Sequence, residues 1–520
     1  MSSRTRRTRA VALGTVLVLL SAAGCATTGG GGSGGVDTIR STWTSDPTTF
    51  DPALVTGVDD YRMAQIGFDT VLRRDDDGLI AGIATDYEQT DNGVILEIGD
   101  TGTCGDGTMI TPTIVANSLQ RLADPETGSA IAPLIFGGAG VTVTADDDAG
   151  TVEIELDKPY SELILGLTVP AAGIVCPAGL EDPEGLAAGT VDGAWSGPYA
   201  LSKATPGVDY RFALNADYDN WAEYADPLEG RPAENLVFTI GSDGAIPNQL
   251  ATGELDVAII PYQELPRFED DDAYDTEFGV LGDYYLIFNE SQSSPFADPA
   301  LRHAAAQVVD RAAFREAVNP LGDLLLSAGD PQLQCVNTDE SLIVPQDEAA
   351  ASEALAGVTI RLIGPQAIGV NGAGITYIAE RLRAAGATVD SQITDTGSWI
   401  STILSPAASG DWDATVFASI NNVGTLANGL SRVLGPTVAD GGRNLSYAQN
   451  AVADEAYAAA MAATDDESKC AAYADAQRAV LEANTLVPLS TNVTTYVARD
   501  GFSVRHPAGR ENLSTLRITE

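Results

Sequence analysis

The sequence predicts an α/β fold in which mixed, partly parallel sheets are flanked by helices. Three observations carry this prediction. Apolar and polar residues alternate through much of the first third of the chain, as they do in half-buried strands. A strand, a helix and a second strand follow one another closely between residues 358 and 393. The composition, with 44% hydrophobic residues, is that of a globular chain.

The N-terminal segment is predicted to direct the chain out of the cytoplasm. Four arginines precede an apolar run, Ala10–Leu20, that is too short to span a bilayer. The residues that end at Cys25 resemble a bacterial lipobox, whose cysteine carries lipid. We therefore expect a lipoprotein signal peptide over residues 1–24 and a flexible leash, rich in glycine, over residues 25–35. The alternative is an ordinary signal peptide that is cut elsewhere, which would leave Cys25 without a role.

The first third of the mature chain is expected to consist mainly of strands. Apolar residues occupy every second position in residues 94–98, 141–143 and 152–156. The last two segments flank an acidic turn that ends in glycine, which predicts a β-hairpin. Between residues 98 and 141, Pro112 opens a short helix over residues 114–122.

Later segments alternate between helix and strand. Asp298 is placed to cap a helix whose apolar side runs from Leu301 to Ala312. The β-branched run Val358–Ile363 is followed by apolar residues at helical spacing, which stop at Gly386. Further strands are expected at Ala387–Ile393 and Ala414–Ala418, and this order implies a partly parallel sheet.

The end of the chain is predicted to be helical before it returns to strands. Ser468–Ala483 carries apolar residues on one face, as an amphipathic helix does. No internal repeat of fixed period is evident. A length of 520 residues predicts two to four domains.

The charge balance excludes one class of partner. The formal net charge is −45, and removal of the four N-terminal arginines leaves 24 basic and 73 acidic residues, a net charge of −49. Such a field repels phosphate backbones, so we expect no nucleic-acid binding. Acidic runs at residues 75–77, 146–148 and 269–272 are typical of solvated turns, which favours a role in solubility.

Four cysteines remain besides Cys25, namely Cys104, Cys176, Cys335 and Cys470. An even number in an oxidising compartment predicts disulfides, and four cysteines allow three pairings. The spacing C-x-x-C is absent, so we expect no zinc site and no other metal site.

The sequence offers no set of catalytic residues. It contains two histidines, of which His303 is expected on a helix surface and His506 in a loop. The G-x-S-x-G string at residues 31–35 lies in the leash and lacks the strand and helix that flank a nucleophile. Metalloprotease, P-loop and dinucleotide motifs are absent as well. We therefore expect neither an enzyme nor a cofactor.

Several motifs in collinear order resemble one known family, the extracytoplasmic solute-binding receptors of ABC importers in the cluster that includes oligopeptide, dipeptide and nickel binders. The resemblance runs through most of the mature chain, with departures such as Tyr87 where tryptophan is usual. It is carried by Phe68–Leu72 with Gly82–Tyr87, by 106–108 with 111–115, by Gly197–Tyr199 with Asn215–Tyr218, by Gly253–Ala258 and by Tyr284–Ala317.

The resemblance implies a two-lobed periplasmic-binding-protein-like fold of class II, with an extra N-terminal subdomain and lobes that close like a clamp. Lobe I would comprise residues 36–290, including a subdomain at about 66–180, and residues 486–520. Lobe II would comprise residues 291–485. The favoured cysteine pairing, Cys104 with Cys176 and Cys335 with Cys470, keeps each pair within one lobe.

Ligand contacts are expected from aromatic, amide and hydroxyl side chains at strand ends that face the hinge. For each aromatic ring, a place in the ordinary core is the alternative. Peptide-binding relatives carry an aspartate near the strand that ends at residue 418, and this chain has none there, which argues against a free peptide amine as ligand. Scarce histidines argue against nickel. The expected contacts are Trp43, Tyr284, Tyr285, Trp399, Phe417, Ser419, Asn421 and Asn422.

The resemblance thus implies a substrate-binding lipoprotein of an ABC importer, anchored to the outer face of the cell membrane through Cys25. It would capture a small polar solute, with a peptide-like compound favoured over an oligosaccharide, and deliver it to membrane permease subunits. One alternative is a receptor-like lipoprotein that serves signalling or envelope assembly without transport. A secreted hydrolase is the remote alternative, because no nucleophile and base are paired.

Overall fold

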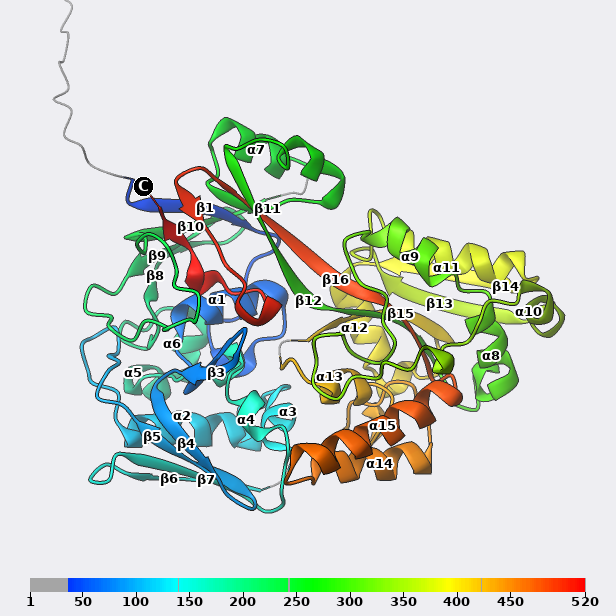
Figure 1. Ribbon diagram of the computed structural model, residues 1–520, viewed down its shortest axis with the longest axis horizontal. Helices are drawn as coiled ribbons and strands as arrows, with labels where there is room; N and C mark the ends of the chain where they lie inside the picture. The colour runs from blue at the N-terminus through cyan, green and yellow to red at the C-terminus, as the bar shows by residue number, and fades with distance from the viewer. Residues whose placement is uncertain (1–35, 139, 242–243, 422, 520) are drawn as a thin grey trace, which may run out of the picture. The chain divides into compact units, whose positions relative to one another are not determined.

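The computed structural model describes residues 36–138, 140–241, 244–421 and 423–519 (Figure 1). From Asp37 onward the chain forms one compact unit. The predicted signal peptide, Cys25, the leash and Asn422 lie outside the described residues. Within the ranges that are described, no helix combines the length and the apolar character that a membrane crossing requires.

A four-stranded sheet in the order β1-β10-β9-β8 forms near the N-terminus. Strand β1 runs parallel to β10, and the other pairs are antiparallel. The Trp43 ring stacks on Phe238 with 4.4 Å between ring centroids, so this face of the sheet belongs to the core. The strands are β1 (Thr38–Trp43), β8 (Tyr199–Thr205), β9 (Asp209–Leu214) and β10 (Asn235–Ile240).

A second four-stranded sheet, antiparallel throughout, has the order β4-β5-β7-β6. Every second residue of β7 is buried, as its alternating sequence predicts. The side chain of Thr111 accepts a hydrogen bond from the Ile114 amide and caps the predicted helix, α2. The expected strands, the hairpin and the helix are confirmed as β5 (Gly93–Ile98), α2 (Pro112–Ala123), β6 (Val141–Asp146) and β7 (Thr151–Leu156), and β4 (Ala84–Gln89) is an additional strand of this sheet.

Short elements complete this half of the molecule. Helix α7 ends at Gly253, whose φ of 78° lies in the left-handed region that favours glycine, and the turn leads directly into a strand. The other short elements are α1 (Val58–Gly67), β2 (Leu72–Asp75), β3 (Gly78–Ala81), α3 (Ala132–Phe136), α4 (Leu163–Gly166), α5 (Pro177–Glu181), α6 (Pro183–Ala188), α7 (Ile246–Thr252), β17 (Phe502–Ser503) and β18 (Arg517–Ile518).

A six-stranded mixed sheet in the order β11-β16-β12-β15-β13-β14 links the two halves. Its two longest strands, β12 and β16, pair antiparallel and run from the region around β1 to the region around β13 (Figure 1). Strand β13 is parallel to both β14 and β15, which confirms the predicted parallel component. The strands are β11 (Val257–Ile259), β12 (Tyr274–Phe288), β13 (Thr359–Pro365), β14 (Thr388–Thr394), β15 (Ala414–Ile420) and β16 (Leu486–Arg499).

Helices supply a separate apolar core on each face of this sheet between residues 284 and 489. Helix α11 connects β13 to β14 and ends just before Gly386, as predicted, and α15 corresponds to the predicted C-terminal helix. The helices are α8 (Pro299–Gln307), α9 (Arg311–Val318), α10 (Glu348–Leu355), α11 (Ala373–Ala384), α12 (Thr396–Ile403), α13 (Leu426–Leu430), α14 (Ala451–Met461) and α15 (Asp466–Glu482).

One predicted helix is divided in two. Asp298 caps its start as expected, but α8 ends at Gln307. Asp310 then caps a new helix, α9, through a hydrogen bond to the Ala313 amide. Ala312, which was expected on the apolar side of a continuous helix, is exposed as a result.

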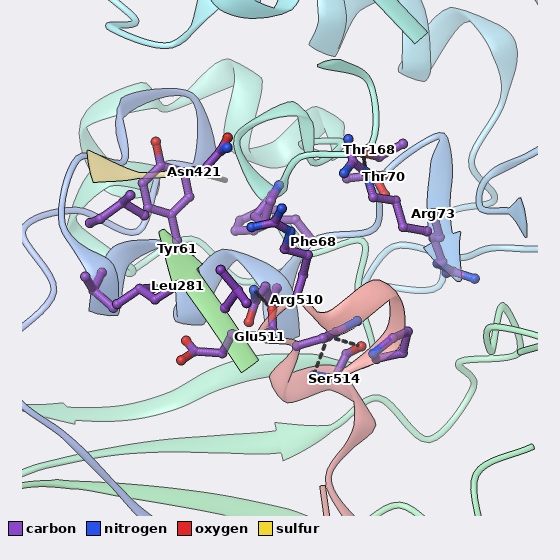
Figure 2. A pocket seen from close by; sticks show the side chains of 18 of the residues that line it. Tyr61, Phe68, Thr70, Arg73, Thr168, Leu281, Asn421, Arg510, Glu511 and Ser514 are labelled. Carbon is purple, nitrogen blue, oxygen red and sulfur yellow. Dashed lines mark hydrogen bonds between the residues drawn. The ribbon is translucent and has the colours of Figure 1, made fainter. Parts of the chain in front are cut away.

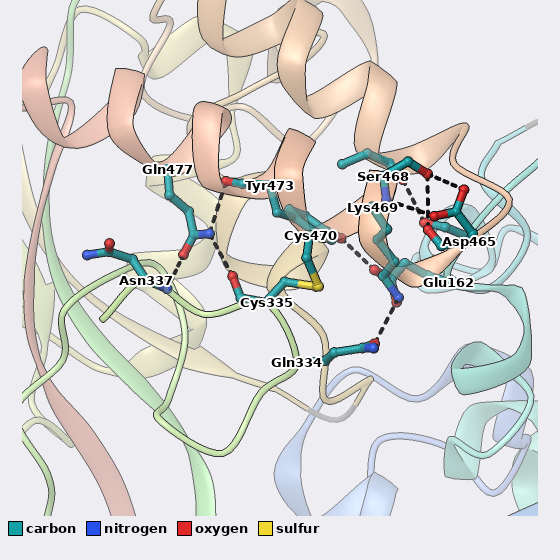
Figure 3. Close-up of a disulfide and its surroundings, with 12 residues drawn as sticks. Glu162, Gln334, Cys335, Asn337, Asp465, Ser468, Lys469, Cys470, Tyr473 and Gln477 are labelled. Carbon is teal, nitrogen blue, oxygen red and sulfur yellow. Dashed lines mark hydrogen bonds and ion pairs between the residues drawn. A yellow bond between two sulfur atoms is a disulfide. The ribbon is translucent and has the colours of Figure 1, made fainter. Parts of the chain in front are cut away.

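We call the two halves lobe I and lobe II. Lobe I comprises β1–β11, α1–α7 and the segment after β16; lobe II comprises α8–α15 with β13–β15, and β12 and β16 join them. The residue boundaries that the sequence suggested stay a prediction. A disulfide lies in each lobe, Cys104–Cys176 in lobe I and Cys335–Cys470 in lobe II (Figure 3), which is the favoured pairing.

Candidate ligand-binding site

A cavity of about 130 Å³ lies where lobe I, the joining strand β12 and the end of β15 meet. Helix α1 contributes Tyr61, and the C-terminal segment of residues 507–514 contributes Arg510 and Ser514 (Figure 2). Strand β12 contributes Leu281, and Asn421 follows β15 from lobe II. Both lobes therefore meet at one cavity, which is where a clamp would enclose a ligand.

Two buried ion pairs stiffen the wall of the cavity in lobe I. Arg73 lies 2.9 Å from Asp69, and Arg62 lies 2.6 Å from Glu511. Burial by itself would lower the pKa of Arg73, but the charge of Asp69 raises this pKa above its ordinary value. Asp69 and Glu511 are thus each paired with an arginine, although Arg62 also pairs with Asp59 at 2.7 Å.

Arg510 joins the C-terminal segment of lobe I to lobe II. Its Nη2 donates to Asp330 Oδ2 at 2.6 Å. Its Nη1 is buried and has no hydrogen-bond partner among the described residues. A donor of this kind in a cavity wall is available to an acceptor on a ligand.

Arg74 lines the same cavity without a carboxylate within 4 Å among the described residues. Its Nε donates to Thr168 Oγ1 at 3.0 Å, and its Nη2 donates to the carbonyl of Val423 in lobe II at 2.5 Å. Burial, together with the positive charge of Arg510, lowers the pKa of Arg74 to about 10. The guanidinium is therefore held in a site that opposes its charge.

Of the contacts that the sequence suggested, only Asn421 lines this cavity, where its Oδ1 accepts from the Gly424 amide at 2.9 Å. Asn422 lies outside the described residues. The six others are placed in the cores, each no more than 4% exposed: Trp43, Tyr284, Tyr285, Trp399, Phe417 and Ser419.

These six side chains are buried in the cores and do not line this cavity, and their role as ligand contacts stays a prediction. Their polar atoms mostly find partners in the core: the Trp399 indole donates to Thr415 Oγ1 at 3.0 Å, and Tyr285 donates to Asp283 and to the carbonyl of Ala328. Large rings stabilise a fold most when they are fully packed, which is the alternative that the sequence left open. Val280 and Leu281, which precede Tyr284 on β12, line the cavity instead.

Few features of the sequence indicate which residues line the cavity. Arg73 and Arg74 are adjacent basic residues that immediately precede the acidic run 75–77, in a chain with 28 basic and 73 acidic residues. Tyr61 lies on a helix without a distinct apolar stripe, and Arg510 lies in an irregular segment. Only the folded chain brings these four residues together.

Neither histidine lines the cavity. His303 is exposed on α8, as expected, whereas His506 is buried against the Tyr496 ring, with 4.8 Å between ring centroids. Burial lowers the pKa of His506 to about 4, so the imidazole is neutral at pH 7. The described part of the chain holds no group of three or more histidine, cysteine or acidic side chains placed to bind a metal ion.

A family profile described as bacterial extracellular solute-binding proteins, family 5, middle region, matches residues 79–441. Two curated proteins are similar in sequence. The periplasmic murein peptide-binding protein MppA of Escherichia coli (strain K12) is 27% identical over 303 residues, 54% of this chain and 54% of MppA. Protein XP55 of Streptomyces lividans is 26% identical over 360 residues, 64% of this chain and 61% of XP55. The chain thus spans little more than half the length of these relatives.

A solved structure covers almost the whole chain. It is a substrate-binding protein from Microbacterium hydrocarbonoxydans complexed with 4-hydroxybenzoate hydrazide, with a TM-score of 0.85 and 39% sequence identity. The likeness covers 93% of this chain and 100% of that one. It therefore includes both lobes and the strands that join them.

Proposed function

Because the chain belongs to the bacterial extracellular solute-binding proteins of family 5, we propose that it encloses a small polar solute between its lobes and delivers it to an ABC permease. Its two-lobed α/β fold is the periplasmic-binding-protein fold that the sequence predicted. Members of this family bind extracytoplasmic solutes as part of ABC transporters and are not enzymes.

The cavity shared by both lobes is the observation that carries this proposal. Its wall combines apolar side chains such as Phe68 and Leu281 with polar ones such as Asn421 and Ser514, as small-molecule sites do. The cavity volume of about 130 Å³ is small, which favours a compact solute over a long peptide.

Three classes of ligand are candidates for this cavity. A short peptide-like compound is the first candidate, because MppA is named for murein peptides. An aromatic acyl compound is the second, because the Microbacterium protein was solved with 4-hydroxybenzoate hydrazide at 39% identity. An oligosaccharide is the third comparison.

A thermal-shift screen of di- and tripeptides, aromatic acids with their amides and hydrazides, and oligosaccharides tests the proposal. A ligand that binds only the folded state stabilises it by about 2.7 kcal/mol at one hundred times its dissociation constant. We expect at least one compound to raise the melting temperature in proportion to the logarithm of its concentration. A screen in which nothing stabilises the protein would count against solute capture.

Transport and turnover are separated by two further measurements. Deletion of the gene should abolish uptake of the radiolabelled ligand found in the screen, and re-expression should restore it. Unimpaired uptake would favour the alternative of a receptor for signalling or envelope assembly. We expect the ligand to be recovered unchanged after prolonged incubation with the protein. Hydrolysis of the ligand would favour the remote alternative, a secreted hydrolase.

We also propose that lipid on Cys25 holds the protein at the outer face of the cell membrane, as the lipobox-like sequence suggests. The variant Cys25→Ser should appear in the soluble fraction and lose metabolic labelling with palmitate, while its ligand affinity stays unchanged. Continued membrane association of the variant would contradict the anchor.

A further inference from the structure

Three arginines around the cavity lack a carboxylate partner. They are Arg74 from lobe I and Arg432 and Arg443 from lobe II, and among the described residues no carboxylate lies within 4 Å of any of them. The chain has 73 acidic and 28 basic residues, so negative side chains are abundant. Most other buried or half-buried arginines are paired, as Arg62, Arg73 and Arg510 are.

Arg432 follows helix α13. Its Nε is buried and has no hydrogen-bond partner among the described residues. Its guanidinium carbon lies 5.1 Å from the centroid of the Phe417 ring, a cation–π contact that attracts the charge but does not neutralise it. Burial and the charge of Arg443 hold the pKa of Arg432 well below its ordinary value.

The hydrogen bonds of Arg443 go to neutral groups. Its Nε donates to Ser431 Oγ at 3.2 Å, and its Nη2 donates to Asn428 Oδ1 at 3.4 Å. Burial lowers its pKa as well, and tyrosine hydroxyls partly oppose this shift. Two like charges thus lie near each other inside lobe II.

A short chain of contacts leads from these two arginines to the cavity. Asn428, which accepts from Arg443, donates its Nδ2 to the carbonyl of Ile420 at 3.0 Å, and Ile420 lines the cavity. Tyr61, which also lines the cavity, interacts electrostatically with both Arg432 and Arg443. From the opposite side, Arg74 donates to Val423 in the segment that follows β15.

Two carboxylates, Asp330 and Glu162, act on Arg74 and partly oppose the lowering of its pKa, but each also pairs with another cation. Asp330 pairs with Arg510 at 2.6 Å, and Glu162 lies 3.3 Å from Lys469. A buried charge without a counter-charge is unfavourable, so a protein keeps one where a partner arrives from outside. Guanidinium groups bind carboxylate and phosphate oxygens through paired hydrogen bonds.

We infer that this site selects an anionic solute, whose carboxylate, phosphate or sulfonate group binds Arg74 in the cavity wall and is attracted by the charges of Arg432 and Arg443, which lie behind that wall in lobe II. This inference rests on the proposed function, since it names the charge of the solute that the clamp encloses. The negative group of the ligand supplies the paired counter-charge that no carboxylate of the described residues provides. Because it attracts arginines of both lobes, it stabilises the closed form.

Matched pairs of compounds isolate the charge of the ligand. The probes are 4-hydroxybenzoate against 4-hydroxybenzamide and the hydrazide, N-acetylglycine against its amide, and dialanine against dialaninamide. Phenyl phosphate and benzenesulfonate distinguish the kinds of anion, and maltose is a neutral control. Dissociation constants are measured by calorimetry on the intact protein. We expect the tightest ligand to be an acid that binds at least tenfold more tightly than its amide.

Variants then assign the preference to these arginines. Arg432→Gln should weaken binding of the acid at least tenfold and leave binding of the amide unchanged, because only the charged partner is lost. Arg432→Lys should restore part of the preference. Arg267→Gln is the matched control, since Arg267 is exposed, pairs with Glu264 and lies outside the cavity. A merely structural role for Arg432 would weaken binding of acid and amide alike.

The outcomes separate the two proposals. If a neutral compound binds as tightly as its acid, or if Arg432→Gln affects both alike, the anion site is wrong and solute capture stands. If no compound binds, solute capture itself fails and this inference fails with it.

Discussion

Asp283 is the most perturbed carboxyl group near the site. It lies on β12 with 1% of its surface exposed, and its Oδ2 accepts from the Tyr285 hydroxyl at 2.9 Å, while its Oδ1 has no partner among the described residues. Burial and the charge of Asp330 raise its pKa to about 7, and the hydrogen bond from Tyr285 and the charge of Arg510 oppose this shift. The carboxyl group is thus partly protonated at neutral pH.

This perturbation predicts a pH dependence of stability. Between pH 4 and pH 7 the folded state holds a proton on Asp283 that the unfolded state has released, so the free energy of unfolding falls as the pH rises. The slope from this one group is at most about 1.4 kcal/mol per pH unit. In urea titrations at pH 5 and pH 8, Asp283→Asn should gain stability relative to the wild type as the pH rises. Asp272→Asn, at an exposed site, should follow the wild type.

At the residue scale, the sequence predicted burial better than function. Trp43 was offered as a ligand contact with the core as its alternative, and the core is where it lies. Asn421, which was predicted as a contact because the ends of strands gather at one edge of a sheet, lines the cavity, and its contact with a ligand stays a prediction. Arg74 and Arg432 could not be chosen, since an arginine is recognised as unpaired only when its neighbours in space are known.

At the join between β12 and β15, the two strands pack closely around Gly282. A Cβ on Gly282 would lie 1.7 Å from the carbonyl oxygen of Ser419, which is backbone and cannot turn aside. The register of β12 against β16 also shifts at this point. Glycine is therefore required where the joining strand passes the cavity.

Gly282→Ala should lower the free energy of unfolding by at least about 2 kcal/mol, because the clash forces the strands apart. It should also weaken ligand binding, since the neighbouring Leu281 lines the cavity. Chemical unfolding and calorimetry measure the two effects. Gly244→Ala is the control, as no described atom lies within 4 Å of its added Cβ, and a similar loss there would contradict the explanation.

The disulfide Cys104–Cys176 ties the segment before α2 to the start of α5 across 72 residues, with 6.0 Å between Cα atoms. The double variant Cys104→Ser, Cys176→Ser should lose about 2–4 kcal/mol of stability, because its unfolded chain is less constrained. The variant should also be less sensitive to reducing agent than the wild type in thermal unfolding. An unchanged melting temperature would show that lobe I does not depend on this bond.

At the element scale, local patterns were sufficient where they were strong. The β13-α11-β14 unit follows from a β-branched run, an apolar helical face and a stop at Gly386. The break between α8 and α9 was missed because the apolar spacing continues from Leu301 to Ala312, while Asp310 acts as a new cap. The apolar spacing favours one continuous helix, whereas the cap at Asp310 favours a new start, and the folded chain adopts the new start.

For the whole molecule, a buried contact between residues that do not line the cavity also holds the lobes together. Glu162 of lobe I accepts from the Tyr473 hydroxyl at 2.5 Å and lies 3.3 Å from the ammonium group of Lys469, both on α15 (Figure 3). The amide and hydroxyl of Ser161 donate to carbonyls at the end of α14, each at 2.8 Å. These bonds exist only while the two lobes touch.

Glu162→Ala should therefore favour the open form and raise the ligand dissociation constant about tenfold, because ligand binding must now close the lobes without this contact. Small-angle scattering should show a larger radius of gyration for the variant at the same sub-saturating ligand concentration. Glu264→Ala, which removes an exposed carboxylate, is the control. Equal affinities in all three proteins would exclude a role in closure.

By itself, the sequence determined the α/β class, the order of the main strands and helices, and the family; of the three cysteine pairings that it allowed, it favoured the one that the structure contains. The class, the order of elements and the family follow from local sequence features, namely apolar spacing, helix caps and collinear motifs. The tertiary structure alone decided which side chains meet at the cavity. Tyr61, Arg74, Asn421 and Arg510 lie far apart in the chain and approach one another only when β12 and β16 bring lobe I against lobe II. Whether a charge is paired is likewise a property of neighbours in space, so the positive character of the site became visible only in the folded protein.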